Sequence, residues 1–191
     1  MKKSFFSNNF IGLNRLDDCG FKAWIFEPGM LIAAEDQWWG DSAKRSVPHE
    51  GLDIVCFVDA NNRRHPLPQK ARVPALFDGE IVLVMDDFLG QSVFIRHLFQ
   101  EERGTLYSIY GHVVLLEHLC IGSMIREGDC IGMINHDKAV KCPPHLHVSV
   151  AIIPDAINPE QLSWKKISET REITILDPLD LFPAAHVVVQ Q

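Results

Sequence analysis

Short runs of apolar residues alternate with turn-forming residues along most of the chain. The runs are rich in Val, Ile and Phe, and Gly, Asp, Asn or Pro separates them. This pattern is typical of an antiparallel β protein. It predicts strands at 52–58, 80–85, 92–98, 106–110, 130–134, 146–152 and 172–176. We therefore expect a mainly β fold, built as a single curled antiparallel sheet domain.

Two segments lack this pattern. Residues 1–46 carry Trp24, Trp38 and Trp39 among Gly, Asp and Glu, with little regular alternation. We expect them to form an N-terminal cover segment or a pro-segment over a β domain at 47–191 that ends in a C-terminal tail. Residues 154–171 are polar and of mixed charge, which predicts an excursion before the last strand.

Composition and charge exclude several classes of function. The 191 residues are 47% hydrophobic, enough for one buried core, and the net charge of −7 disfavours nucleic-acid partners, which bind clustered Lys and Arg. No apolar run is long enough to span a bilayer. The basic start at Lys2 and Lys3 is followed by Asn8 and Asn9, so no export signal is predicted. Five cysteines without paired spacing predict free thiols.

The first candidate motif is Pro48-His49-Glu50-Gly51-Leu52-Asp53. Pro48, Gly51 and the β-branched residues after Asp53 favour a loop that leads into a strand. The glycine lets the backbone turn, so the side chains of His49 and Asp53 converge. By itself, a His and an Asp at this spacing are more often a solvated pair.

The second motif, Pro143-Pro144-His145-Leu146-His147-Val148, places two histidines at the head of an alternating strand, on one face. A third, Tyr110-Gly111-His112, ends another strand. Together the three motifs supply one carboxylate and four imidazoles. Two His and one Asp fill three positions of a tetrahedral zinc site and leave the fourth for water.

These motifs, in this order, resemble the lysostaphin and LytM type of zinc endopeptidases, which cut peptide cross-bridges in bacterial cell walls. The resemblance runs from about residue 47 to 150 and implies the duplicated hybrid motif fold. It implies one zinc ion, with His49, Asp53 and His147 as metal ligands. It also implies that His112 and His145 are the catalytic histidines. The substrates that it implies are peptides of peptidoglycan.

Supporting segments at 74–82, 93–97 and 125–132 also resemble this family. Two departures are visible. Cys142-Pro143-Pro144 replaces the usual Thr-Gly-Pro, and Val148-Ser149 replaces the usual Phe-Glu. They bear on substrate preference more than on metal binding. The family works in the cell envelope or outside the cell, whereas the chain shows no export signal.

Two alternatives belong to other classes. The segment at 127–140 resembles the lysine hairpin of lipoyl carrier domains, with Lys138 at the tip. A carrier has no use for the five metal-site and catalytic residues, so we interpret Lys138 as a solvated turn residue. The other alternative keeps the fold as a catalytically silent module that binds peptidoglycan or a partner. All five positions are present, which favours an enzyme.

Overall fold

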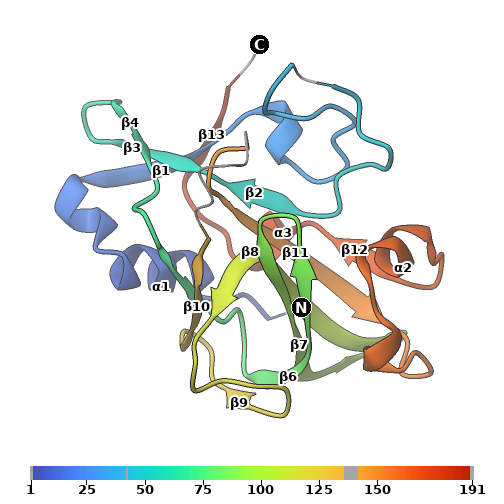
Figure 1. The fold of residues 1–191 in the computed structure, drawn as a ribbon. Helices are drawn as coiled ribbons and strands as arrows, with labels where there is room; N and C mark the ends of the chain where they lie inside the picture. Colours follow the sequence, from blue (N-terminus) through green and yellow to red (C-terminus); the bar gives the residue numbers. More distant parts are fainter. Residues whose placement is uncertain (1, 42, 136–141, 190–191) are drawn as a thin grey trace.

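The computed structural model describes residues 2–41, 43–135 and 142–189 and confirms a mainly β, antiparallel fold (Figure 1). The strands are β1 (Phe21–Phe26), β2 (Leu52–Ile54), β3 (Cys56–Asp59), β4 (Arg64–Pro66), β5 (Arg72–Pro74), β6 (Gly79–Asp87), β7 (Gly90–Glu101), β8 (Gly104–Leu115), β9 (Met124–Ile125), β10 (Cys130–Ile134), β11 (Leu146–Ile153), β12 (Thr174–Leu176) and β13 (His186–Val188). The helical segments are α1 (Phe6–Leu13), η1 (Leu16–Cys19), η2 (Pro28–Met30), η3 (Pro159–Gln161), α2 (Trp164–Glu169) and α3 (Pro178–Leu181).

The strands divide between two sheets. The nine-stranded sheet runs β12-β11-β8-β7-β6-β9, with β10 paired to β8, β5 paired to β10, and β2 paired to β11. The four-stranded sheet has the order β13-β1-β3-β4, and its β1–β13 pair is parallel. The long β6–β7 and β7–β8 hairpins form the centre of the larger sheet.

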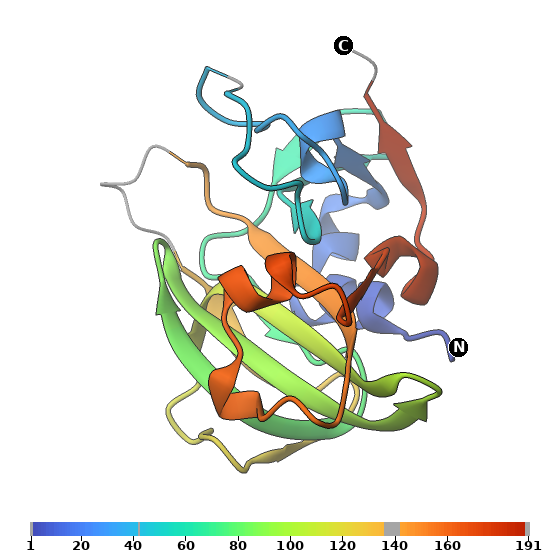
Figure 2. The same cartoon turned by 90° about the vertical axis from the view of Figure 1, so that its right-hand side faces the viewer.

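Alternation along the central strands sorts their side chains onto two faces. On β11, Val148 and Val150 face the main core, which also receives Phe6 and Phe10 of α1. The odd-numbered residues of β11 face the other way, where Ile153 packs with Ile167 of α2. Figure 2 shows α2 lying across one face of the large sheet, with α1 on the opposite side.

The predicted strand at 52–58 is two strands, β2 and β3, separated by Val55. β2 pairs with β11 in one sheet and β3 pairs with β1 in the other, so the chain changes sheets at this point. The apolar run is continuous in sequence although the strand is interrupted, because its two halves are buried by different partner strands.

Residues 1–46 contain regular structure that the pattern did not predict. β1 lacks alternation because both of its faces are covered: Trp24 packs in the main core, and Ala23 and Ile25 pack with Cys56 and Val58 on the other side. The helix α1 and this strand share the main core with the large sheet. The C-terminal tail also packs there, through Leu181 and Phe182.

Three smaller expectations can be compared with the structure. All five cysteines are free, as predicted, with Cys56 and Cys142 buried. In the described part of the chain, every helix is too short or too polar to cross a membrane. The hairpin tip at Lys138 lies outside the described residues.

Candidate metal centre

Strand pairing brings Asp53 and His147 together. In the antiparallel β2–β11 ladder these two residues are direct cross-strand partners, and Leu52 and Ile54 flank Asp53 with side chains in the main core. Directly opposed residues project from the same face of a sheet, a few ångströms apart. His49 reaches the same point from the loop that precedes β2, as the first motif predicted.

Gly51 allows this loop to press against β11. A Cβ atom at this position would lie 2.6 Å from Ser149 Oγ and 2.9 Å from His147 Nε2, and it would also collide with the carbonyl oxygen of Val148. Glycine is required here because the two backbones approach each other closely. The structure gives this steric reason in place of the conformational one expected from the sequence, because Gly51 does not have a left-handed φ.

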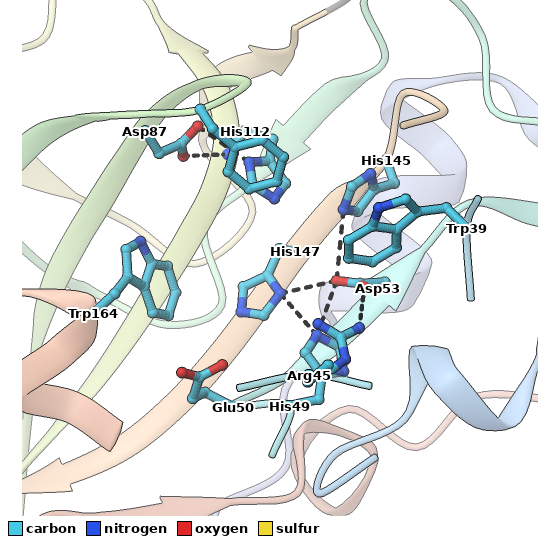
Figure 3. A pocket seen from close by; sticks show the side chains of 11 residues that line it. Trp39, Arg45, His49, Glu50, Asp53, Asp87, His112, His145, His147 and Trp164 are labelled. Atoms are coloured by element: carbon cyan, nitrogen blue, oxygen red, sulfur yellow. Dashed lines mark hydrogen bonds and ion pairs between the residues drawn. The ribbon is translucent and has the colours of Figure 1, made fainter. Parts of the chain in front are cut away.

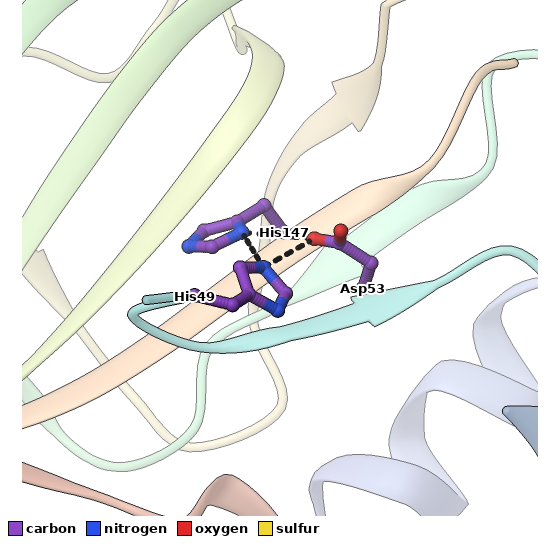
Figure 4. Close-up of side chains that lie close together, drawn as sticks. All are labelled: His49, Asp53 and His147. Carbon is purple, nitrogen blue, oxygen red and sulfur yellow. Dashed lines mark hydrogen bonds and ion pairs between the residues drawn. The ribbon is translucent and has the colours of Figure 1, made fainter. Parts of the chain in front are cut away.

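The three side chains converge on one point (Figure 4). His49 Nε2 lies 3.2 Å from Asp53 Oδ1 and 3.1 Å from His147 Nδ1, and His147 Nδ1 lies 2.8 Å from Asp53 Oδ1. All three residues are buried. They form a group of one carboxylate and two imidazoles whose ligand atoms all lie within 4.8 Å of one another.

Each of these side chains has a second partner that fixes its orientation. His49 Nδ1 donates to the carbonyl oxygen of Leu31 at 2.9 Å, and His147 Nε2 lies 2.8 Å from Ser149 Oγ. Trp38 Nε1 donates to Asp53 Oδ2 at 2.7 Å, which leaves Oδ1 to face the histidines. Such outer partners are typical of protein metal sites, where they orient the ligands.

The donor set fits a metal ion. Because the carbonyl oxygen of Leu31 can only accept, His49 Nδ1 donates in that bond, and Nε2 is the ring atom that faces the carboxylate of Asp53 and the ring of His147. One carboxylate oxygen and two ring nitrogens that converge in a buried site are a donor set suited to zinc. With zinc–ligand bonds of 2.0–2.1 Å, tetrahedral ligand atoms lie about 3.3 Å apart, a few tenths of an ångström more than the separations here.

Burial and neighbouring charges set the protonation states. Burial raises the pKa of Asp53, but the neighbouring histidines His145, His147 and His49 outweigh it, so the pKa of this carboxyl lies well below its usual value. Burial lowers the pKa of His147 to about 4 and also lowers the pKa of His145. The site therefore favours a carboxylate at Asp53 and neutral rings at His147 and His145, and carboxylate and neutral imidazole are the forms that bind zinc.

The structure places His145 and His112 beside this cluster but outside it. His145 lies just before β11, with Nε2 3.7 Å from Asp53 Oδ1 and Nδ1 donating to the carbonyl oxygen of Pro143 at 2.8 Å. The rings of His112 and His145 are 4.7 Å apart between centroids. His112 hydrogen-bonds through Nδ1 to Asp87 Oδ1 at 3.1 Å.

A pocket of about 290 Å³ opens over the five residues (Figure 3). Aromatic side chains from three separate segments line it: Trp39, Phe88 and Trp164. Arg45 also lines the pocket, with its guanidinium 4.9 Å from the centre of the Trp39 ring and 3.7 Å from Asp53 Oδ2. The pocket thus combines aromatic walls with charged side chains.

Sequence reasoning missed several residues of this site, chiefly Trp38, Arg45, Asp87 and Trp164. Trp38 and Trp39 stood out within the expected cover segment, although nothing in their spacing indicated contact with Asp53. Trp164 lies in the excursion at 154–171, and its ring packs edge-on against His147 at 5.0 Å. These contacts join segments far apart in the chain, so no local motif marks them.

Replacing Gly51 by alanine is expected to weaken metal binding at least about 10-fold, the loss typical when the support of a ligand is disturbed. The added methyl group must displace His147 or Ser149, because the backbone of Val148 cannot yield. Zinc titration against a competing chelator measures the effect. Gly12→Ala is the matched control, since no atom lies within 4 Å of a Cβ there. Equal zinc affinity in both variants would contradict this account.

Comparison with known proteins agrees with the geometry. The profile of peptidase family M23 matches residues 48–159, more than half of the chain and including all five candidate residues. No curated protein matches the chain in sequence. Solved structures similar to this chain include CbpA of L. salivarius REN, with 16% identity, a TM-score of 0.49 and coverage of 83% of this chain and 87% of that one.

Two further structures are similar to the chain. The catalytic domain of the antimicrobial peptidase lysostaphin from Staphylococcus simulans is 17% identical, with a TM-score of 0.48 and coverage of 88% of this chain and 95% of that one. A zinc-containing peptidase from Vibrio cholerae is 21% identical, with a TM-score of 0.41 and coverage of 68% and 37%. The profile match confirms the resemblance to the lysostaphin and LytM type: the chain belongs to peptidase family M23.

Proposed function

We propose that this chain is a zinc-dependent endopeptidase that hydrolyses peptide bonds in the cross-bridges or stem peptides of peptidoglycan. One observation carries the proposal: the ligand atoms of His49, Asp53 and His147 converge beneath a pocket into which two further histidines are directed. Membership of family M23 supports the same chemistry.

Within this proposal, His49, Asp53 and His147 hold one zinc ion, and a fourth position stays open to the pocket. A zinc ion bound there would lower the pKa of a water molecule to roughly 7 and polarise the scissile carbonyl. The protein contributes a rigid, buried set of ligands. Trp38 and Leu31 keep Asp53 and His49 in orientation through their hydrogen bonds.

His112 and His145 carry the proton transfers. Hydrolysis forms a bond between the water oxygen and the carbonyl carbon, breaks the C–N bond and moves a proton to the leaving amine. Both histidines use Nδ1 for hydrogen bonds to fixed oxygens, of Asp87 and Pro143 respectively, so Nε2 is the ring atom left for the substrate and the water. The centroids of the two rings are 4.7 Å apart, which allows both histidines to act on one reacting group.

Residues 1–46 act in this proposal as a cover that belongs to the active enzyme. Trp38 donates to a ligand carboxylate, and Trp39 and Arg45 line the pocket. Phe6 and Phe10 lie fully buried in the main core. A pro-segment, by contrast, would have to be removed before the site could work. Removal here would strip partners from the ligands and side chains from the core.

Metal removal tests the proposal. The intact chain is expected to bind one zinc ion and to release new amino groups from purified peptidoglycan. Treatment with a chelator should abolish the release. Zinc should restore it and Mg²⁺ should not, because Mg²⁺ prefers octahedral oxygen ligands. Elemental analysis gives the zinc content, and labelling of free amines gives the rate.

Two outcomes would contradict the proposal. A zinc-loaded chain that binds peptidoglycan without cleaving it would favour the silent binding module. Activity that appears only after proteolytic removal of residues 1–46 would show that this segment is a pro-segment.

A further inference from the structure

Asp87 is a second buried carboxylate beside the proposed reaction centre, and it contacts none of the candidate metal ligands. It ends β6, and its side chain is 5% exposed. Figure 3 shows it directed at His112. It holds that residue twice: Oδ2 accepts the backbone N–H of His112 at 2.9 Å, and Oδ1 lies 3.1 Å from Nδ1 of its ring.

Four donors surround the Asp87 carboxylate. Besides the two from His112, Oδ1 accepts the backbone N–H of Leu89 at 2.8 Å, and Oδ2 accepts the hydroxyl of Ser92 at 2.8 Å. The Ser92 oxygen accepts in turn from Trp164 Nε1 at 2.9 Å, so its own hydrogen is free to be given to Asp87. A carboxylate can only accept, which requires that His112 Nδ1 carry a proton. In the neutral ring, Nε2 is then the atom with the lone pair.

The backbone of His112 also needs support. Its φ is 65°, in the left-handed region that residues with a side chain rarely occupy. The β7–β8 register shifts between Gln91 and Val93, and β8 contributes the extra residue, a β-bulge that turns the His112 side chain toward the pocket. Such a conformation persists only where its surroundings hold it. The bond from the His112 N–H to Asp87 does so directly.

We propose that Asp87 is a positioning residue that fixes the orientation and the tautomer of His112, and that Ser92 and Trp164 hold Asp87 in place. This inference rests on the proposed function, in which His112 acts on the substrate. Trp164 belongs to α2, in the excursion at 154–171. That segment is thereby linked through two hydrogen bonds to Asp87, and through Asp87 to the histidine.

Asp87→Asn is the decisive variant, with Asp86→Asn as its matched control, since Asp86 is the exposed neighbour on the same hairpin. Asp87→Asn should keep one zinc ion per chain and a KM within about twofold of the parent, while kcat falls about 10²- to 10³-fold, as when a preorganised catalytic contact is lost. Nitrogen-15 NMR of the histidine rings, assigned with His112→Gln, should show that His112 no longer carries its proton on Nδ1. Asp86→Asn should match the parent in every measurement.

Trp164→Phe serves as a second variant because Asp87→Asn can fail to fold. The amide NH₂ of asparagine would face groups that are themselves hydrogen-bond donors. Trp164→Phe keeps an aromatic ring, although a smaller one, and removes the donor to Ser92. We expect kcat to fall about 10-fold, in keeping with the loss of an outer support. An Asp87→Asn chain with the parent's kcat and His112 tautomer would overturn the inference, as would an unchanged kcat in Trp164→Phe if Asp87→Asn does not fold.

The NMR measurement needs no substrate and separates the two proposals. A parent chain without hydrolysis, whose His112 nevertheless changes tautomer in Asp87→Asn, would uphold the positioning by Asp87 and refute the peptidase. If the parent chain hydrolyses peptidoglycan, but Asp87→Asn changes neither the His112 tautomer nor kcat, the peptidase is upheld and the positioning by Asp87 is refuted.

Discussion

Replacing His147 by alanine is expected to abolish stoichiometric zinc binding and peptide hydrolysis together. Only His49 and Asp53 would remain of the three ligands, and Asp53 would lose its shortest contact within the cluster, that to His147 Nδ1 at 2.8 Å. A bound metal supplies several kcal/mol of transition-state stabilisation, and each 1.4 kcal/mol is a factor of ten, so the rate should fall at least about 10³-fold.

Elemental analysis of the purified variant and the rate of amine release from peptidoglycan measure the two effects. His118→Ala is the control, because His118 is exposed and away from the pocket lining. Circular dichroism distinguishes loss of metal from loss of the fold, since His147 is buried. A folded His147→Ala chain that retains zinc and full activity would remove His147 from the proposed ligand set.

Strands of the large sheet could be predicted from the sequence where an uninterrupted apolar run between turn residues covered the whole strand. The bounds predicted for β10, 130–134, agree with the structure. β8 was predicted at 106–110 but extends over Gly104–Leu115, since Gly111 and the left-handed His112 interrupt the apolar pattern while the chain still pairs with its neighbours. The feature that broke the pattern is the bulge that directs His112 to the pocket. A local rule fails there because the site needs an irregular backbone.

The candidate ligands could be predicted because two of them share a five-residue motif and the third belongs to a pair of histidines on one strand. The supporting residues could not. Asp87 and His112 are 25 residues apart, and Trp164 lies 72 residues from Ser92. Asp87 is the last residue of a strand and Trp164 the first of a helix, so their sequence context predicts only local structure. Their proximity to the histidines arises from the pairing of β6, β7 and β8 and from the packing of α2 on that sheet.

Replacing His145 by alanine is expected to separate metal binding from catalysis. His145 lies two residues from His147, but its Nε2 is 3.7 Å from Asp53 Oδ1, farther than any contact within the cluster of three. The zinc content should therefore stay at one ion per chain. The loss of a preorganised proton-transfer group should lower kcat about 10²- to 10³-fold, with KM changed much less.

His145→Gln is the matched companion, because glutamine can keep a hydrogen bond in this buried position but cannot accept or release a proton near neutral pH. Both variants should fail alike in kcat if proton transfer is the role of His145, whereas a purely structural role would let glutamine recover most of the rate. Loss of zinc in either variant would instead make His145 a ligand. It would then be a fourth protein ligand, in the position left for water, and an enclosed metal site of that kind is structural rather than catalytic.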